Sequence, residues 1–211
     1  MKVSVAALPW LREGYELVPC GGALGRGCGP LVLTRDTSVT SVAGRSVAVP
    51  GDRTTAYLLL RLWSEQGPPA SVSVVPFAEI MPAVAQGRYD AGLVIHEARF
   101  TYPRHGLRCL VDLGEWWESE TGLPIPLGAI VARRGAVDPD EAAGWIRESL
   151  RQAWADPAAS EPYVVAHAAE MEPDVVARHI ALYVNEFTMD LGAEGRAAID
   201  TLLARTPVER S

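Results

Sequence analysis

The chain has 211 residues, of which 48% are hydrophobic and 21% charged, a size that allows one sizeable hydrophobic core or two modest ones. Its formal net charge of -7 at pH 7 and its lack of long basic runs exclude a surface that neutralises nucleic-acid phosphates, so we expect no nucleic-acid partner. No apolar segment approaches the ~20 residues that span a bilayer, and the first residues lack the apolar core of a signal peptide, so we expect no membrane insertion and a cytoplasmic location.

The N-terminal part combines a helix-like stretch at residues 6–11, a glycine-rich loop at residues 21–29 and a strand-like run at residues 30–34. The loop lacks the Lys-Ser/Thr pair of a phosphate-binding loop, and it runs into a strand rather than into a helix. We interpret it as tight turns and close backbone approaches at a hinge or cleft wall, with a nucleotide-binding fingerprint as the less favoured alternative.

Three cysteines, Cys20, Cys28 and Cys109, form no CxxC pair. An odd number without that spacing disfavours both a disulfide framework and a structural zinc site. We expect reduced, structural thiols, and we expect neither a metal nor a cofactor.

The middle of the chain alternates strand-like and helix-like segments. Strand-like runs lie at residues 46–49, 72–75 and 91–95, with one helix starting near Thr54 and Thr55 and another at about residues 77–86. Right-handed crossovers between such strands predict a parallel sheet, and the commonest small arrangement places the first strand between the other two.

The third of these strands ends in His96, which is followed at once by Glu97. Ligands gather outside the carboxyl ends of strands in open parallel sheets. Because adjacent strands lie ~5 Å apart, the helix start at Thr55, with its unpaired N–H groups, faces the same crevice. This predicts an anion-binding corner beside a titratable base, although a lone histidine can also be a satisfied core residue.

Residues 115–120 join two tryptophans to three carboxylates. Since neighbouring residues cannot share one helix face, we expect Trp116 or Trp117 to face a lobe boundary or a ligand cleft. Packing between domains and contact with a ligand both stay open.

The last part of the chain is helical, with helices predicted at about residues 140–154, from Pro173 onward, and at about residues 194–203. The middle one carries an amphipathic stripe of Val176, Ile180, Tyr183, Val184 and Phe187. His167, Glu170 and His179 match no compact zinc motif, which favours solvated or packing roles for them.

Several motifs occur in one order along the chain: SVAALPWL at residues 4–11, GALGRGCGP at 22–30, TTA at 54–56, IHEARFTY at 95–102, DLGEWW at 112–117 and YVNEF at 183–187. Together they closely resemble the 1,4-dihydroxy-6-naphthoate synthases, enzymes of the futalosine route to menaquinone. The related chorismate dehydratases share the fold but not the residue 96–97 and 116–117 segments.

The resemblance implies an α/β fold of the type II periplasmic-binding-protein kind, with a ligand cleft between two lobes. Residues 1–37 and 137–211 then form a discontinuous first lobe and residues 38–136 the second, with residues 31–34 and 127–132 as the crossings. Family members carry an additional first strand and helix with a Ser-Pro-Cys-Pro-Asn-Asp-Thr-like loop. We therefore expect an N-terminally truncated chain with an incomplete first lobe.

The resemblance also implies a lyase that converts cyclic dehypoxanthinylfutalosine to 1,4-dihydroxy-6-naphthoate and dihydroxyacetone, with this small molecule as partner. His96 matches the family's catalytic base, and Ser4, Thr55 and Ala56 match substrate-binding positions; a role for Glu97 in orienting the imidazole is less favoured. A histidine of ordinary pKa, ~6.5, accepts a proton near neutral pH. The alternatives are a noncatalytic binding protein for a small carboxylate and an inactive truncated form.

Overall fold

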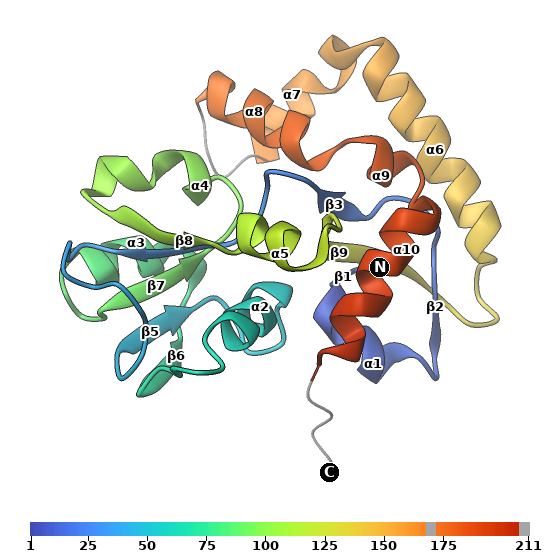
Figure 1. The fold of residues 1–211 in the computed structure, drawn as a ribbon. Helices are drawn as coiled ribbons and strands as arrows, with labels where there is room; N and C mark the ends of the chain where they lie inside the picture. Colours follow the sequence, from blue (N-terminus) through green and yellow to red (C-terminus); the bar gives the residue numbers. More distant parts are fainter. Residues whose placement is uncertain (168–171, 207–211) are drawn as a thin grey trace.

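The computed structural model describes residues 1–167 and 172–206, which form two α/β lobes (Figure 1). One lobe is built on a five-stranded sheet of order β6-β5-β7-β4-β8. The other is built on a smaller sheet in which β1, β2 and β3 all pair with β9. Within the described residues, no helix is long and apolar enough to cross a membrane.

The parallel part of the five-stranded sheet follows the predicted pattern. Strand β5 (Ser46–Val49) lies between β6 (Ser71–Val74) and β7 (Ala91–Val94) and pairs in parallel with both. Helices α2 (Thr55–Trp63) and α3 (Phe77–Ala85) make the crossovers. The predicted strand order is therefore confirmed, with element ends shifted by about one residue.

Strand β4 (Leu31–Thr34) enters this sheet from the other lobe and pairs antiparallel with β7 and with β8 (Arg108–Asp112). All four of its residues are buried, as expected for a strand covered on both faces. Between β7 and β8 the chain forms α4 (Ala98–Thr101) and the short 3-10 helix η2 (Tyr102–His105).

The smaller sheet depends on one long strand, β9 (Ile125–Arg133). It pairs antiparallel with β1 (Lys2–Ser4), β2 (Tyr15–Leu17) and β3 (Ala23–Gly25). The 3-10 helix η1 (Val5–Ala7) and helix α1 (Leu8–Leu11) connect β1 to β2.

The expected lobe boundaries at residues 37 and 136 lie beyond the places where the chain changes sheets. By strand pairing, the chain passes to the larger sheet between β3 and β4 and returns between β8 and β9. The difference arises because each crossing strand is incorporated into the sheet that it reaches.

The glycine-rich loop makes the close backbone approach that we expected. A Cβ atom added at Gly29, whose φ is +158°, would lie 2.6 Å from the backbone nitrogen of Gly114. A Cβ added at Gly114 would lie 1.9 Å from the carbonyl oxygen of Cys28. Glycine is required at both positions because the crossing segment packs directly on the helix α5 (Leu113–Thr121).

Among the described residues, the first lobe is completed by helices α6 (Pro139–Ala155), α7 (Pro157–His167), α8 (Pro173–Tyr183), α9 (Glu186–Met189) and α10 (Gly192–Ala204). The predicted stripe through Phe187 is wrong as a single helix, because α8 ends at Tyr183. Asn185 then caps α9 by accepting a hydrogen bond from the Phe187 backbone N–H at 3.0 Å.

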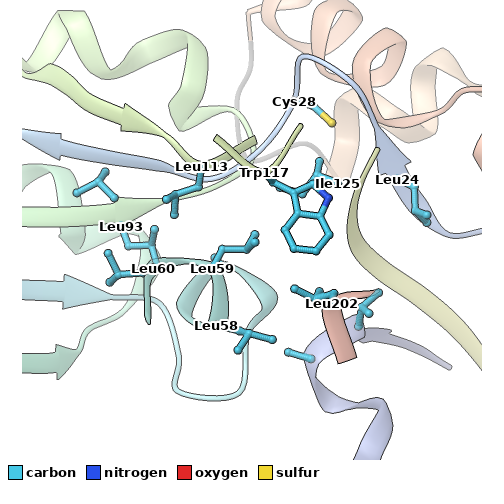
Figure 2. Packing of buried hydrophobic residues seen from close by; sticks show 14 of the residues in the cluster. Leu24, Cys28, Leu58, Leu59, Leu60, Leu93, Leu113, Trp117, Ile125 and Leu202 are labelled. Carbon is cyan, nitrogen blue, oxygen red and sulfur yellow. The ribbon is translucent and has the colours of Figure 1, made fainter. Parts of the chain in front are cut away.

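Residues of both lobes share one hydrophobic core (Figure 2). Trp117 of α5 is fully buried there, and its indole Nε1 donates a hydrogen bond to the Pro124 carbonyl at 3.1 Å. Leu59 comes from the second lobe, and Ile125 and Leu202 come from the first. Of the two alternatives for the tryptophan pair, packing between lobes therefore describes Trp117.

Candidate functional site

A cleft of about 330 Å³ lies between the lobes, and we call it the interlobe cleft. The four residues that the sequence proposed, Ser4, Thr55, Ala56 and His96, all line it. Its polar side chains come from both lobes: Lys2, Ser4, His179 and Tyr183 from the first, and Thr54, Thr55 and His96 from the second. The fold therefore assembles the predicted corner and adds residues that sequence reasoning missed.

His96 lies two residues beyond the end of β7 with a φ of 56°, the only positive φ among non-glycine residues of the described chain. A left-handed backbone conformation at a non-glycine residue costs about 1–3 kcal/mol of conformational strain, and it persists because the surrounding structure holds it in place. Phe77, at the start of α3, packs edge-on against the imidazole, with ring centroids 5.9 Å apart. The left-handed backbone of His96 and the packing of the Phe77 ring together direct the imidazole into the interlobe cleft.

Incomplete hydration between the two lobes lowers the pKa of His96 below its ordinary value. The negative charge of Glu97 opposes this shift, and the positive charge of Lys2 adds to it. The ring is consequently neutral at pH 7, the form that accepts a proton. Within the described residues no hydrogen bond joins the Glu97 carboxylate to the ring, so Glu97 acts on His96 through its charge.

The start of α2 presents backbone N–H groups to the same cleft. Thr54 is the capping residue, and its hydroxyl accepts a hydrogen bond from the Tyr57 N–H at 3.1 Å. Thr55 and Ala56 are the first two helical residues, whose N–H groups have no partner within a helix. Together with the helix dipole, these groups suit an anion such as a carboxylate.

The hydroxyl of Thr55 makes two hydrogen bonds within the protein. It donates to the Leu127 carbonyl at 2.9 Å and accepts from the Ala6 N–H at 3.2 Å, and the residue is 2% exposed. These bonds tie α2 to β9 and η1 of the first lobe. The hydroxyl proton is therefore already donated within the protein, which leaves the backbone N–H groups at the start of α2 as the donors open to the cleft. Substrate binding by Thr55 stays a prediction.

Lys2 and Ser4 extend the predicted anion-binding corner from the first lobe. They lie two residues apart on β1 and so share one face of the strand. Partial desolvation by the surrounding residues lowers the pKa of Lys2, which stays exposed, and Ser4 makes no capping hydrogen bond with its side chain. Sequence reasoning missed Lys2 because a lysine near the N-terminus looks solvated, yet the i, i+2 spacing with Ser4 carried the signal.

Helix α8 closes the cleft from the other side. Glu172, which caps it, makes a bidentate ion pair with Arg104 of η2, with both N–O distances 2.6 Å. The guanidinium of Arg178 lies 4.8 Å from the ring centroid of Phe100 in α4. These contacts hold His179 against the second lobe, with its ring centroid 5.8 Å from that of His96.

Tyr183 follows His179 by one helical turn, and the two rings lie 4.7 Å apart. Burial raises the pKa of Tyr183 above its usual range, so the phenol stays protonated and can donate a hydrogen bond. Sequence reasoning gave His179 a solvated or packing role and placed Tyr183 on the amphipathic stripe of the helical tail. Their i, i+4 spacing was the available signal, but it did not show that this face meets the cleft.

The turn that carries His96 is anchored by Arg99. Its guanidinium pairs with the Asp112 carboxylate and donates to the Gly27 and Gly29 carbonyls at 3.1 and 3.2 Å. Asp112 in turn caps α5 by accepting from the Gly114 N–H at 2.9 Å. The crossing segment and the turn that carries His96 are thereby fixed to each other.

The structure contains no group of three or more metal-ligating side chains within the described residues. Glu170, one of the weak metal candidates, lies outside those residues. His167 stacks on Tyr163 at 4.1 Å, while His179 lies in the interlobe cleft.

All three cysteines are free thiols. Burial raises the pKa of Cys28 to about 12 and that of Cys109 to about 11, so both remain protonated. They therefore act as small apolar side chains, as the sequence predicted.

The sequence profile of the menaquinone biosynthesis family matches residues 1–207. Over 214 residues the chain is 58% identical to the 1,4-dihydroxy-6-naphthoate synthase of Streptomyces coelicolor, covering 99% of this chain and 76% of the relative. It is 47% identical over 208 residues to the enzyme of the same name from Thermus thermophilus, covering 96% and 74%.

Solved structures agree with the fold. A protein from Archaeoglobus fulgidus is 31% identical and superposes with a TM-score of 0.87, over 97% of this chain and 76% of its own. A Candida albicans protein with the periplasmic binding protein fold is 10% identical, with a TM-score of 0.68 over 100% and 74%. The two-lobed periplasmic-binding-protein-like fold predicted from the sequence is confirmed.

Proposed function

Because this chain belongs to the menaquinone biosynthesis family, we propose that it is the lyase that splits cyclic dehypoxanthinylfutalosine into 1,4-dihydroxy-6-naphthoate and dihydroxyacetone. Its homologues indicate an enzyme of menaquinone biosynthesis, and they are named for the first of these products. The reaction needs a carboxylate-binding corner and a base, and the interlobe cleft offers both.

The substrate carboxylate occupies the start of α2 in this proposal. The N–H groups of Thr55 and Ala56 donate to its oxygens, and the ammonium of Lys2 and the hydroxyl of Ser4 approach from the first lobe. Binding at this point orients the rest of the molecule toward the end of β7. The bound substrate then spans both lobes.

His96 is the base, and its geometry is the observation that carries the proposal. Its left-handed backbone turns a neutral imidazole into the cleft that also holds the helix start. There it takes a proton near the substrate carbonyl, which allows the carbon–carbon bond to break. We place this reaction in the cytoplasm, in keeping with the three free thiols.

A noncatalytic carboxylate-binding protein is the competing function, and His96→Asn separates the two. If the protein is a lyase, the turnover rate of this variant should be ~10²–10⁴-fold lower than that of the unaltered protein. Substrate affinity should change by less than tenfold, because removing a general base affects ground-state binding little. Rates come from product formation, and affinities from calorimetry.

His105→Asn is the matched control, because His105 is exposed in η2 and does not line the cleft. Its turnover should equal that of the unaltered protein. Turnover by His96→Asn near the unaltered rate removes His96 from the mechanism. An unaltered protein that binds the substrate without releasing dihydroxyacetone favours the binding protein.

A further inference from the structure

We propose that His179 is the second proton-transfer residue of the cleft: it protonates the fragment that receives the electron pair when the carbon–carbon bond breaks. This role rests on the proposed lyase function. It gives the two lobes complementary tasks, since His96 belongs to one lobe and His179 to the other.

The first argument is placement. The imidazoles of His96 and His179 come from opposite lobes, line the same cleft and have centroids 5.8 Å apart, with ring planes inclined by 50°. At this separation both rings reach neighbouring atoms of one bound molecule. Helix α8 cannot drift freely from this position, because Glu172 and Arg178 hold it to the second lobe.

The second argument is an unused hydrogen-bonding group. The Nδ1 atom of His179 is buried and has no hydrogen-bond partner among the described residues. Buried polar atoms in proteins are nearly always paired, because an unpaired one costs about 1–3 kcal/mol. A packing histidine in this helix would be expected to bond a backbone carbonyl. An unpaired ring nitrogen next to a substrate cleft instead indicates a residue that exchanges a proton.

The third argument is the charge around the ring. His179 faces His96 and Glu97 of the second lobe, Lys2 of β1 and Tyr183 of its own helix. Burial lowers its pKa, the positive charges of His96 and Lys2 lower it further, and Glu97 opposes them. A proton on one imidazole therefore disfavours a proton on the other, so the charged form of the pair is singly protonated. An arriving substrate carboxylate favours that singly protonated state.

The proton balance closes over one turnover. His96 takes a proton from the substrate, the carbon–carbon bond breaks, and the fragment that keeps the electron pair takes a proton from His179. His96 is then protonated and His179 neutral. Transfer of the proton from the first ring to the second, directly or through water, restores the starting state without an outside acid or base.

The kinetic test is His179→Gln, which keeps an amide hydrogen-bonding group but cannot transfer a proton as an acid. We expect turnover at neutral pH to fall by ~10²-fold or more, with substrate affinity changed by less than threefold. In the unaltered protein kcat/KM should fall at both low and high pH. His179→Gln, which lacks the acid, should lose the fall at high pH, and His96→Asn, which lacks the base, should lose the fall at low pH. His105→Gln is the matched control and should leave the profile unchanged.

A second measurement requires no turnover. NMR titration of the histidine ring protons in the substrate-free protein should show that His96→Gln raises the pKa of His179, because a neighbouring positive charge is removed. A packing role for His179 would not produce this shift together with the change in the pH profile. The titration also covers the case in which His179→Gln folds poorly.

An unaltered protein that forms product, combined with a His179→Gln variant of full rate and unchanged pH profile, overturns the role of His179 and leaves the lyase function standing. An unchanged His179 titration in His96→Gln also overturns it. An unaltered protein that forms no product overturns the lyase function, and the role of His179 with it.

Discussion

The two sheets of this protein differ in how their strands come together along the chain. In the second lobe, β5, β6 and β7 follow one another with single helices between them, and the same order appears in space. In the first lobe, three short strands from the first 25 residues gather on β9, about 100 residues later. The local pattern predicted site residues supplied by the alternating segments, whereas Ser4, supplied by distant pairing, was named only through the family resemblance, and Lys2 was missed.

Trp117→Ala tests most strongly whether the two sheets depend on one core. Removing this fully buried ring should cost about 3–5 kcal/mol of the free energy of unfolding. Because residues of both lobes contact the same core, unfolding should remain a single transition in denaturant melts followed by circular dichroism. Separate melting of the two lobes would show that they are independent.

Trp116→Ala is the control for this substitution. Trp116 is half-buried and does not line the interlobe cleft, so the loss of stability should be clearly smaller. If Trp116→Ala and Trp117→Ala lower the free energy of unfolding equally, burial of Trp117 in the shared core gives it no special importance for stability.

Thr55→Val removes the hydroxyl that joins α2 to the first lobe. The Ala6 N–H and the Leu127 carbonyl lose their partner, so unfolding should become easier by about 1–3 kcal/mol. Substrate affinity should change less than stability, since the N–H groups at the start of α2 remain. Calorimetric binding and chemical denaturation measure the two quantities.

Thr40→Val is the control for Thr55→Val, because Thr40 is exposed. It should change stability by no more than about 0.5 kcal/mol. A Thr55→Val protein of full stability but much weaker binding would support the original expectation that this hydroxyl holds the substrate.

Lys2→Gln tests the part of the anion-binding corner that comes from the first lobe. Loss of the ammonium should weaken substrate binding by a few-fold, and added salt should reduce the difference between the two proteins. Arg12→Gln, which removes a positive charge at a residue outside the cleft, should have no such effect. Identical salt dependence in both variants would show that Lys2 does not act on the bound anion.

The smallest expected effect is the dependence of stability on pH. Burial lowers the pKa of His96 and of His179 below 6.5 in the folded protein. The unfolded chain therefore binds protons first as the pH falls, and stability should be complete above about pH 6.5 and decrease below it. Thermal melts from about pH 7 to about pH 5 measure this slope, which should be shallower in a protein carrying both His96→Asn and His179→Gln. A slope that is equal in the two proteins contradicts the assigned shifts.

The sequence by itself determined the local parts of this protein. Alternating strand and helix patterns predicted the order of β5, β6 and β7, and the turn after β7 indicated His96 as a cleft residue. Hydroxyl residues before an apolar helix indicated the start of α2, and dense glycines indicated a close backbone approach, which the structure shows between Gly29 and Gly114. Each of these features depends on neighbouring residues, so its physical cause is visible within a short window.

Only the tertiary structure decided the rest. Antiparallel pairing with β9 carried Lys2 into the cleft, and the contacts of α8 with the second lobe carried His179 to His96. The Thr55 hydroxyl found its hydrogen-bond partners at residues 49 and 72 positions away in the sequence. These positions depend on how the two lobes pack against each other. The local sequence pattern indicates the chemistry of a side chain, but it does not indicate which distant surface that side chain will contact.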